Sequence, residues 1–377
     1  MGMSGSPHAR RKRTALGRLL TAVTIAALVN PSAARAQNTR AATVAARQHF
    51  FGLDNVDSTT GAVRKDRVIL SWQGVSNFAA SFNGHVVLLN AWIARAWWAI
   101  VDNYPGTTAP GWPNLRYVGS SPEELAALKP EAIFFGHGHG DHAGDTPVVV
   151  RTNPGITVLG AAEHCNDLRA EVKDAQFKCI SVFPVDAPLG AVFEVNDLLS
   201  GVQITAVKHP HSNTTTVSEM NQPFSKQKEG GCQAFVDYPG DRNEPRTWNA
   251  LASGSVSVMW QFRIGEFALV WQDTAGPIKG TAVPAALAKL PPTDVRIAAI
   301  AVSGRSAIGE HLDALKPKLF IPVHHDPCGW VFRRQLVEYL DARPKDLRPA
   351  LWFMADPGDY LRPISFDPTA KIWATNK

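Results

Sequence analysis

Three histidines and an aspartate stand within six consecutive positions of this sequence: His137, His139, Asp141 and His142. Glycines separate most of them, and a short apolar run, residues 131–135, precedes them with the look of a buried strand. Residues two apart in an extended chain point to the same side, so His137 and His139 are placed to bind one ion together. The glycines permit a sharp turn that brings Asp141 and His142 round to a second ion. Imidazole and carboxylate groups suit Zn²⁺, with Mn²⁺ or Fe²⁺ as alternatives.

Three later stretches that read as strands also end in side chains able to bind a metal. The strand at 202–207 precedes two histidines, a hairpin across Gly265 ends in an aspartate, and the strand at 319–323 precedes two more histidines. These side chains are His209 and His211, then Asp273, and then His324 and His325. Ligands at strand ends are typical of sites held by a rigid sheet. Strand position alone does not decide which histidine of each pair binds the metal.

The order H-x-H-x-D-H, then His, then Asp, then His resembles the metallo-β-lactamase superfamily. The motif is specific, and the resemblance covers most of residues 68–360, apart from the loops at 94–118 and 213–253. It implies an α/β fold, the four-layered αβ/βα sandwich, with a one- or two-metal site at one edge. The segments Pro-Val-His-His-Asp and Trp-Gln-Asp-Thr look most like its lactonase-like, second lactamase-B branch.

Carried over by position, the resemblance implies ligands for two ions. The first would be held by His137, His139 and His211, the second by Asp141, His142 and His324, and Asp273 would bridge both. His211 is preferred because a serine follows it, and His324 because it lies two residues after a proline, as is usual in the family. His209 is then expected at the rim of the site, and His325 beneath the pocket or as its gate.

Two residues depart from the family pattern. Asn90 stands where the family often has an acidic residue that supports the site, and Gln272 stands where a glycine usually precedes the bridging aspartate. The other histidines of the chain after residue 36 have no ligand spacing, and we assign them no role: His49, His85, His164 and His311.

The resemblance implies hydrolysis by a metal-bridged hydroxide, with Asp141 or Asp273 orienting the water. We expect an ester, lactone or amide bond in a small organic molecule, with tryptophan loops at 97–112 lining an apolar pocket. A phosphodiester is the alternative substrate. Antibiotic hydrolysis is a minor one, because β-lactam-opening enzymes generally lack the bridging carboxylate. An iron-dependent sulfur dioxygenase and a non-catalytic metal-binding protein are the remaining hypotheses, and no G-x-S-x-G elbow indicates a serine nucleophile.

Residues 1–36 have the features of an export signal. A basic segment at 10–13 precedes eleven uncharged residues, 19–29, and Ala34-Arg35-Ala36 offers a cleavage site before Gln37. Eleven apolar residues are too few for a stable membrane anchor. We therefore expect a periplasmic or secreted protein with a single domain at 37–377, which contains a long loop at 213–253.

The chain carries 38 basic and 33 acidic residues, and six of the basic ones but no acidic one lie in the first 36 positions. The remaining part is thus nearly neutral, which argues against a nucleic-acid partner and leaves a small-molecule substrate as the expected one. The sequence does not indicate an oligomeric state. Four cysteines in an exported protein favour disulfides, and Cys165 and Cys179 form the easiest pair, with Cys232 and Cys328 left over.

Overall fold

The computed structural model describes residues 31–93, 120–212, 256–300, 304–325, 329–354, 357–370 and 373–374. By its backbone contacts the chain divides into two units, Met1–Asn38 and Thr39–Lys377, and both sheets belong to the second. The expected loop at 213–253 and the tryptophan loop at 97–112 lie outside the described residues, as do Cys232 and Cys328.

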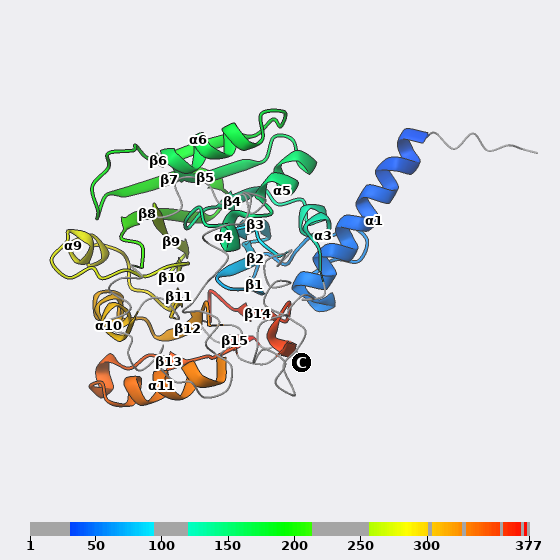
Figure 1. Ribbon diagram of the computed structural model, residues 1–377. Coiled ribbons are helices and arrows are strands. Elements are labelled where there is room, and N and C mark those ends of the chain that lie inside the picture. Colours follow the sequence, from blue (N-terminus) through cyan, green and yellow to red (C-terminus); the bar gives the residue numbers. More distant parts are fainter. Residues whose placement is uncertain are drawn as a thin grey trace, which may run out of the picture. The chain divides into compact units, whose positions relative to one another are not determined.

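The first sheet of the described chain has eight strands, whose spatial order places the last two strands of the chain beside the first (Figure 1). Its strands run β15 (Trp373–Ala374), β14 (Pro363–Phe366), β1 (Val68–Gly74), β2 (Asn77–Phe82), β3 (His85–Leu89), β4 (Ala132–Phe134), β5 (Thr157–Ala161) and β6 (Lys178–Phe183). Strands β3 to β6 pair in parallel, and the others pair antiparallel. The sheet is therefore mixed.

The second sheet has seven described strands and is also mixed. Its strands run β13 (Ala350–Leu351), β12 (Leu319–Val323), β11 (Val295–Ala299), β10 (Phe267–Gln272), β9 (Ser257–Ile264), β8 (Val202–His209) and β7 (Val192–Leu199). Strands β10 to β13 pair in parallel, and β7 to β10 pair antiparallel. The predicted hairpin across Gly265 is β9 and β10.

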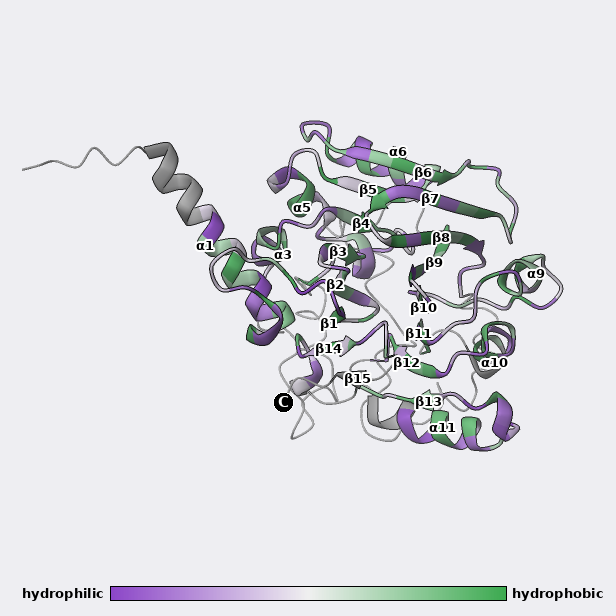
Figure 2. Ribbon diagram, turned by 180° about the vertical axis from the view of Figure 1, so that it is seen from behind, coloured by the Kyte–Doolittle hydropathy of each residue, from purple (hydrophilic) through white to green (hydrophobic). Residues whose placement is uncertain are grey.

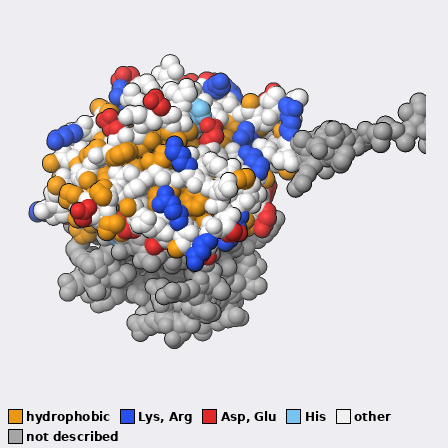
Figure 3. All heavy atoms as spheres, turned by 90° about the horizontal axis from the view of Figure 1, so that it is seen from above, with side chains coloured by type: hydrophobic (Ala, Val, Ile, Leu, Met, Phe, Trp, Pro, Cys, Tyr) orange, Lys and Arg blue, Asp and Glu red, His pale blue; other side chains and the backbone are white. Residues whose placement is uncertain are grey.

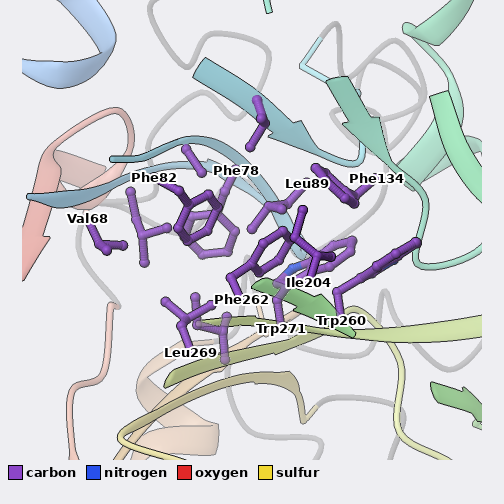
Figure 4. Packing of buried hydrophobic residues seen from close by; sticks show 14 of the residues in the cluster. Val68, Phe78, Phe82, Leu89, Phe134, Ile204, Trp260, Phe262, Leu269 and Trp271 are labelled. Atoms are coloured by element: carbon purple, nitrogen blue, oxygen red, sulfur yellow. The ribbon is translucent and has the colours of Figure 1, made fainter. Parts of the chain in front are cut away.

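The main core lies between the inner faces of the two sheets and is rich in aromatic side chains (Figure 4). Phe82 of the first sheet stacks on Phe262 of the second, with ring centroids 4.3 Å apart. Phe134 meets the edge of Trp260 at a centroid distance of 5.0 Å. Each strand buries alternate residues on this face, so the strands that carry the candidate ligands are fixed by packing on both sheets.

Helices cover the outer face of each sheet (Figures 1 and 2). The first sheet packs against the part of α1 (Pro31–Phe51) that follows Asn38 and against α3 (Pro122–Ala127), α5 (Thr146–Thr152) and α6 (Ala162–Glu171). The second sheet packs against α9 (Val283–Leu287), α10 (Gly304–Leu315) and α11 (Gly329–Asp341). The shorter helices are α4 (Gly140–Ala143) and the 3-10 turns η1 (Leu53–Asn55), η4 (Lys345–Leu347) and η5 (Pro357–Asp359). This order of layers confirms the expected four-layered αβ/βα sandwich. Among the described helices, none has the length and apolar character that a bilayer crossing requires.

Two strand predictions are wrong. The residue pattern over 81–89 predicts one strand with a bend at Asn83 and Gly84, but the chain forms a hairpin there, with β2 ending at Phe82 and β3 beginning at His85. Asn83 and Gly84 have φ values of 53° and 83°, and two positive φ values in a two-residue loop reverse the chain rather than bend it. The apolar run at 350–354 predicts a last strand, but the structure has only the two-residue β13 there, and β14 and β15 follow it.

A disulfide joins Cys165 of α6 to Cys179 of β6, which confirms the pairing expected from sequence. The bridge closes a loop of fourteen residues between the helix and the edge strand that it covers. In the chain-entropy account, a loop of this length stabilises the folded state by about 3 kcal/mol.

The edge strands β6 and β7 lie at the end of the molecule that Figure 3 faces, where hydrophobic side chains are exposed among charged ones. Strand β7 and the loop before it expose four large apolar residues: Val185, Leu189, Val192 and Phe193. The polar outer face usual for an edge strand is therefore incomplete here.

Candidate metal centre

Ligand-type side chains follow four strands, one in the first sheet and three in the second. Strand β4 ends at Phe134, β8 at His209, β10 at Gln272 and β12 at Val323. The segments directly after them supply, in chain order, His137, His139, Asp141 and His142, then His211, then Asp273, and then His324. In the described residues these side chains form three groups, within each of which the ligand atoms lie within 4.8 Å of one another. The structure thus brings together all seven residues that the sequence selected.

The three groups share members. They are His137 with His139 and His211, His137 with His142 and Asp273, and Asp141 with His142 and His324. Asp273 therefore lies beside one histidine of each of the other two groups. A carboxylate that bridges two ions requires this placement.

The carboxylate of Asp273 is fully buried, and its two oxygens have different surroundings. Oδ2 accepts a hydrogen bond from Nδ2 of Asn90 at 2.8 Å and lies 2.8 Å from Nδ1 of His137. Oδ1 has no hydrogen-bond partner in the described part of the chain. Because leaving a buried carboxylate oxygen without a donor is costly, an unpartnered Oδ1 on a carboxylate whose Oδ2 contacts His137 and His142 fits a bound cation.

Gly136 lets the end of β4 approach the end of β10. A Cβ atom at this position would lie 2.0 Å from Cγ of Asp273, and the carbonyl of Gly136 accepts a hydrogen bond from the N–H of Val258 at 2.7 Å. Any side chain here would displace the carboxylate. The glycine that the sequence offered as a turn former therefore serves close packing as well.

Two residues where β1 turns into β2 hold the backbone of two proposed ligands. The sequence did not predict this role. The hydroxyl of Ser76 donates to the carbonyl of Asp273 at 3.1 Å, and Nδ2 of Asn77 donates to the carbonyl of Asp141 at 2.9 Å. Both side chains are fully buried. The only signal in the sequence is a short polar stretch between two apolar strands, which is typical of any turn.

His324 and His325 point to different parts of the molecule. His324 has a positive φ of 59°, and its Nε2 lies 3.4 Å from Oδ2 of Asp141. His325 is buried, with Nε2 beside the carbonyl of Met354 and its ring stacked on Trp72 at 5.5 Å. The placement of His325 under the site agrees with the expectation that it packs beneath the pocket.

His209 also points away from the three groups. It is 2% exposed, and its Nδ1 lies 3.3 Å from the amide nitrogen of Gln272 and 3.0 Å from the carbonyl of Pro210. The expectation of a rim residue is wrong, because β8 ends at His209 and the alternation of an extended strand does not continue to His211.

Electrostatics in the centre favour the forms that bind cations. Burial first, and then the surrounding imidazoles, lower the pKa of His137 well below 6.5, and burial lowers the pKa of His211 to about 4. Burial alone would raise the pKa of Asp141, but His142 and His324 beside it lower that pKa well below 3.8. At neutral pH His137 and His211 are therefore neutral imidazoles and Asp141 is an ionised carboxylate, as metal binding requires.

The histidines without ligand spacing lie outside the three groups. His49 pairs with Glu124 at 2.6 Å, and His85 pairs with Glu131 at 2.8 Å. His164 is buried, and its two ring nitrogens contact the N–H of Ala161 and the carbonyl of Val256. His311 lies within α10, is buried and contacts the carbonyl of Gly276.

No family model matches the sequence, and no curated protein matches it. Solved structures do, and metallo-hydrolases are among them. Igni18, a metallo hydrolase from Ignicoccus hospitalis, is 16% identical, with 80% of this chain and 98% of that chain covered at a TM-score of 0.48. A zinc-dependent hydrolase of the metallo-β-lactamase superfamily from Thermotoga maritima is 12% identical, with 75% and 97% covered at a TM-score of 0.33. The diiron β-hydroxylase CmlA from Streptomyces venezuelae is 11% identical, with 78% and 54% covered at a TM-score of 0.44.

Proposed function

We propose that this chain is a metal-dependent hydrolase with a two-ion centre, of the kind that its motif resembles. The observation that carries the proposal is the convergence of seven side chains from four separate strand ends into groups with ligand atoms within 4.8 Å. The unpartnered, buried Oδ1 of Asp273 supports it, because that atom has no donor among the described residues and belongs to a carboxylate that contacts His137 and His142.

The proposed ligands of the first ion are His137, His139 and His211, and those of the second are Asp141, His142 and His324, with Asp273 shared. Zn²⁺ suits this nitrogen and oxygen set, and Mn²⁺ or Fe²⁺ are the alternatives. Two such ions supply a hydroxide nucleophile at neutral pH and polarise the oxygen of the scissile group.

The chain's own residues then orient the reactants. Asp141 is ionised and partly exposed, so its carboxylate is available to accept a hydrogen bond from the attacking water. Asp273 is held by Asn90 and cannot swing away, because Gly136 lies directly against it. His139 and His211 are partly exposed as well, so solvent and substrate reach the centre from their side.

For the substrate we propose a small organic molecule with an ester, lactone or amide bond, and for the location an export route with cleavage before Gln37. The nearly neutral chain after residue 36 supports a small-molecule partner rather than a nucleic acid. The disulfide between Cys165 and Cys179 supports an oxidising compartment.

Metal analysis of the purified protein, followed by a substrate panel, tests the function. We expect about two ions per chain and turnover of at least one lactone, aryl ester or amide, with none in His139→Ala. Turnover of a phosphodiester or β-lactam alone would replace the substrate class. A chain without metal, or with metal and no turnover of any member, would contradict the proposal.

Mass spectrometry of the protein from its native host tests the export route. The expected mature N-terminus is Gln37. A full-length product in the cytoplasm would contradict this part of the proposal.

A further inference from the structure

Asn90 contacts both the shared carboxylate and a proposed ligand of the second ion. It directly follows β3, is fully buried and has a positive φ of 60°. Its Nδ2 donates to Oδ2 of Asp273 at 2.8 Å and lies 3.0 Å from Nδ1 of His142. Its Oδ1 accepts a hydrogen bond from the N–H of Gly136 at 2.9 Å.

The contact with Gly136 fixes which way the amide of Asn90 points. A backbone N–H can only donate, so the atom that faces it is the amide oxygen, and the NH₂ group faces Asp273 and His142. The flipped amide would set its NH₂ against the N–H of Gly136 and its oxygen against the carboxylate of Asp273. That arrangement loses three hydrogen bonds to gain one, at most.

The amide orientation fixes the tautomer of His142. Because the NH₂ of Asn90 donates to Nδ1 of His142, that nitrogen carries the lone pair, and the ring proton is on Nε2. Nε2 is the atom that lies 3.4 Å from the carboxylate of Asp141, a suitable acceptor for the N–H. Nε2 is also the atom that His142 presents towards His324 and Asp141, where it would have to bind an ion through a lone pair.

His137 is arranged in the opposite way. Its Nδ1 lies 2.8 Å from Oδ2 of Asp273, which accepts the ring proton, so Nε2 keeps its lone pair. Nε2 of His137 lies 3.1 Å from Nδ1 of His139, on the side of the first group. Nδ1 of His139 then carries the proton of this contact, and because the His139 ring is partly exposed, its proton can move to the other ring nitrogen when an ion binds. His142 must move its proton from Nε2 to the buried Nδ1, which faces the NH₂ of Asn90. The nearest acceptor there is Oδ2 of Asp273 at 3.4 Å, and this oxygen already accepts hydrogen bonds from Asn90 and His137.

We propose that Asn90 makes the two ion positions unequal, so that the chain holds one ion tightly at His137, His139 and His211 and a second one weakly at Asp141, His142 and His324. This inference rests on the proposed two-ion centre and adds a residue that controls its occupancy. A carboxylate at position 90 would accept the proton from Nδ1 of His142 and would remove the inequality. It would also place a second negative charge against Asp273 when no ion is bound.

Asn90→Asp tests the inference, with Asn83→Asp as the matched control. Both asparagines have left-handed backbone angles, which aspartate tolerates about as well, and Nδ2 of Asn83 contacts only the carbonyl of Ser200 among the described residues. Zn²⁺ is titrated into the metal-free full chain by calorimetry, and the melting temperature is measured with and without Zn²⁺.

For the wild type we expect two unequal binding steps. In N90D the weaker step tightens by about 10–100-fold, the range usual for a partner that supports a ligand, while the tight step is unchanged. Metal-free N90D melts at a lower temperature than the wild type, and zinc raises its melting temperature by more. A purely structural role of Asn90 would lower both temperatures alike. N83D shows the wild-type binding steps.

The tautomer is tested without any variant of position 90, which keeps the inference falsifiable if N90D does not fold. The ¹⁵N shifts of the His142 ring in the metal-free wild type should show a proton on Nε2, and His142→Gln assigns the signal. A proton on Nδ1 would overturn the inference. Two equal binding steps in the wild type, or no tightening in a folded N90D, would overturn it too and leave the hydrolase proposal standing. A wild type that binds no zinc would overturn both.

Discussion

Two buried polar clusters lie on opposite sides of the end of β10, and they differ in the charge of the groups beside their histidines. The metal-side cluster contains the seven proposed ligands. The helix-side cluster lies at α10 and consists of His209, Gln272, Arg296 and His311. Gln272, the last residue of β10, and Asp273, which directly follows it, belong to different clusters.

The histidines of the two clusters are alike, but the charges around them differ. Burial lowers the pKa of both His209 and His211 to about 4. The metal-side cluster adds the carboxylates of Asp141 and Asp273, whereas the helix-side cluster adds the guanidinium of Arg296, whose partner is the amide oxygen of Gln272 at 3.0 Å. A buried, neutral histidine is thus no sign of a metal ligand by itself. The carboxylate beside it makes the difference.

Asp273→Ala, compared with its neighbour Gln272→Ala, should give the largest effect. D273A removes the shared ligand, so we expect the loss of at least one ion per chain. Turnover should fall by more than about 100-fold, because mutating a residue that only supports a ligand already lowers activity by about 10–100-fold. Q272A should keep both ions but lower the free energy of unfolding by about 1–3 kcal/mol, because Arg296 loses its partner. Metal analysis and denaturant unfolding measure the two. Equal metal loss in both variants would end the contrast between the clusters.

His209 and His211, at the end of β8, allow the same comparison between the two clusters with histidines alone. His211→Ala should lose an ion, whereas His209→Ala should keep both, since its ring contacts Gln272 and Pro210 instead. Loss of metal in H209A with none in H211A would reverse the proposed assignment. Metal content per folded chain is the readout.

The pair at the end of β12 should behave in the same way, with a smaller difference. His324→Ala should lose an ion, because its Nε2 faces Asp141. His325→Ala should keep two ions with affinity weakened by up to about tenfold, because its stacking on Trp72 and Phe353 holds the neighbouring backbone. Titration of Zn²⁺ into both variants decides. Unchanged metal binding in H324A would contradict the assignment.

The smallest effect is on the pH dependence of stability, and it should be the same for the histidines of both clusters. A histidine whose pKa is depressed in the folded state binds its proton more readily when unfolded, so its contribution to stability is lost as the pH falls. For a pKa lowered from 6.5 to about 4, the loss begins near pH 6.5 and reaches about 3 kcal/mol per histidine by pH 4. Unfolding of the metal-free chain between pH 7 and pH 4 should show this slope, and H209A and H211A should each reduce it by a similar amount. A slope unchanged in either variant would contradict the burial of that ring as the cause.

The strand ends and the proposed ligands could be predicted from neighbouring residues in the sequence. Contacts between residues far apart in the sequence could not. The four strand ends could be predicted to within two residues, at 135, 207, 271 and 323, because each apolar run stops where polar residues begin. The support from Ser76 could not, because its target, Asp273, is almost two hundred positions away in the sequence. The pairing of β14 with β1 escaped prediction for the same reason. The roles of the seven side chains as ligands stay predictions until metal is measured.

The proposed ligands come from both halves of the sandwich, and this has a consequence for kinetics. Residues 137–142 follow a strand of the first sheet, whereas His211, Asp273 and His324 follow strands of the second. During folding, the full set can assemble only after the two sheets have docked, so tight metal uptake should be a late event that reports on docking. Once bound, the ions tie the sheets together, and separation of the halves must release them. The lifetime of the folded protein in the presence of a chelator should therefore follow the rate at which the ions leave.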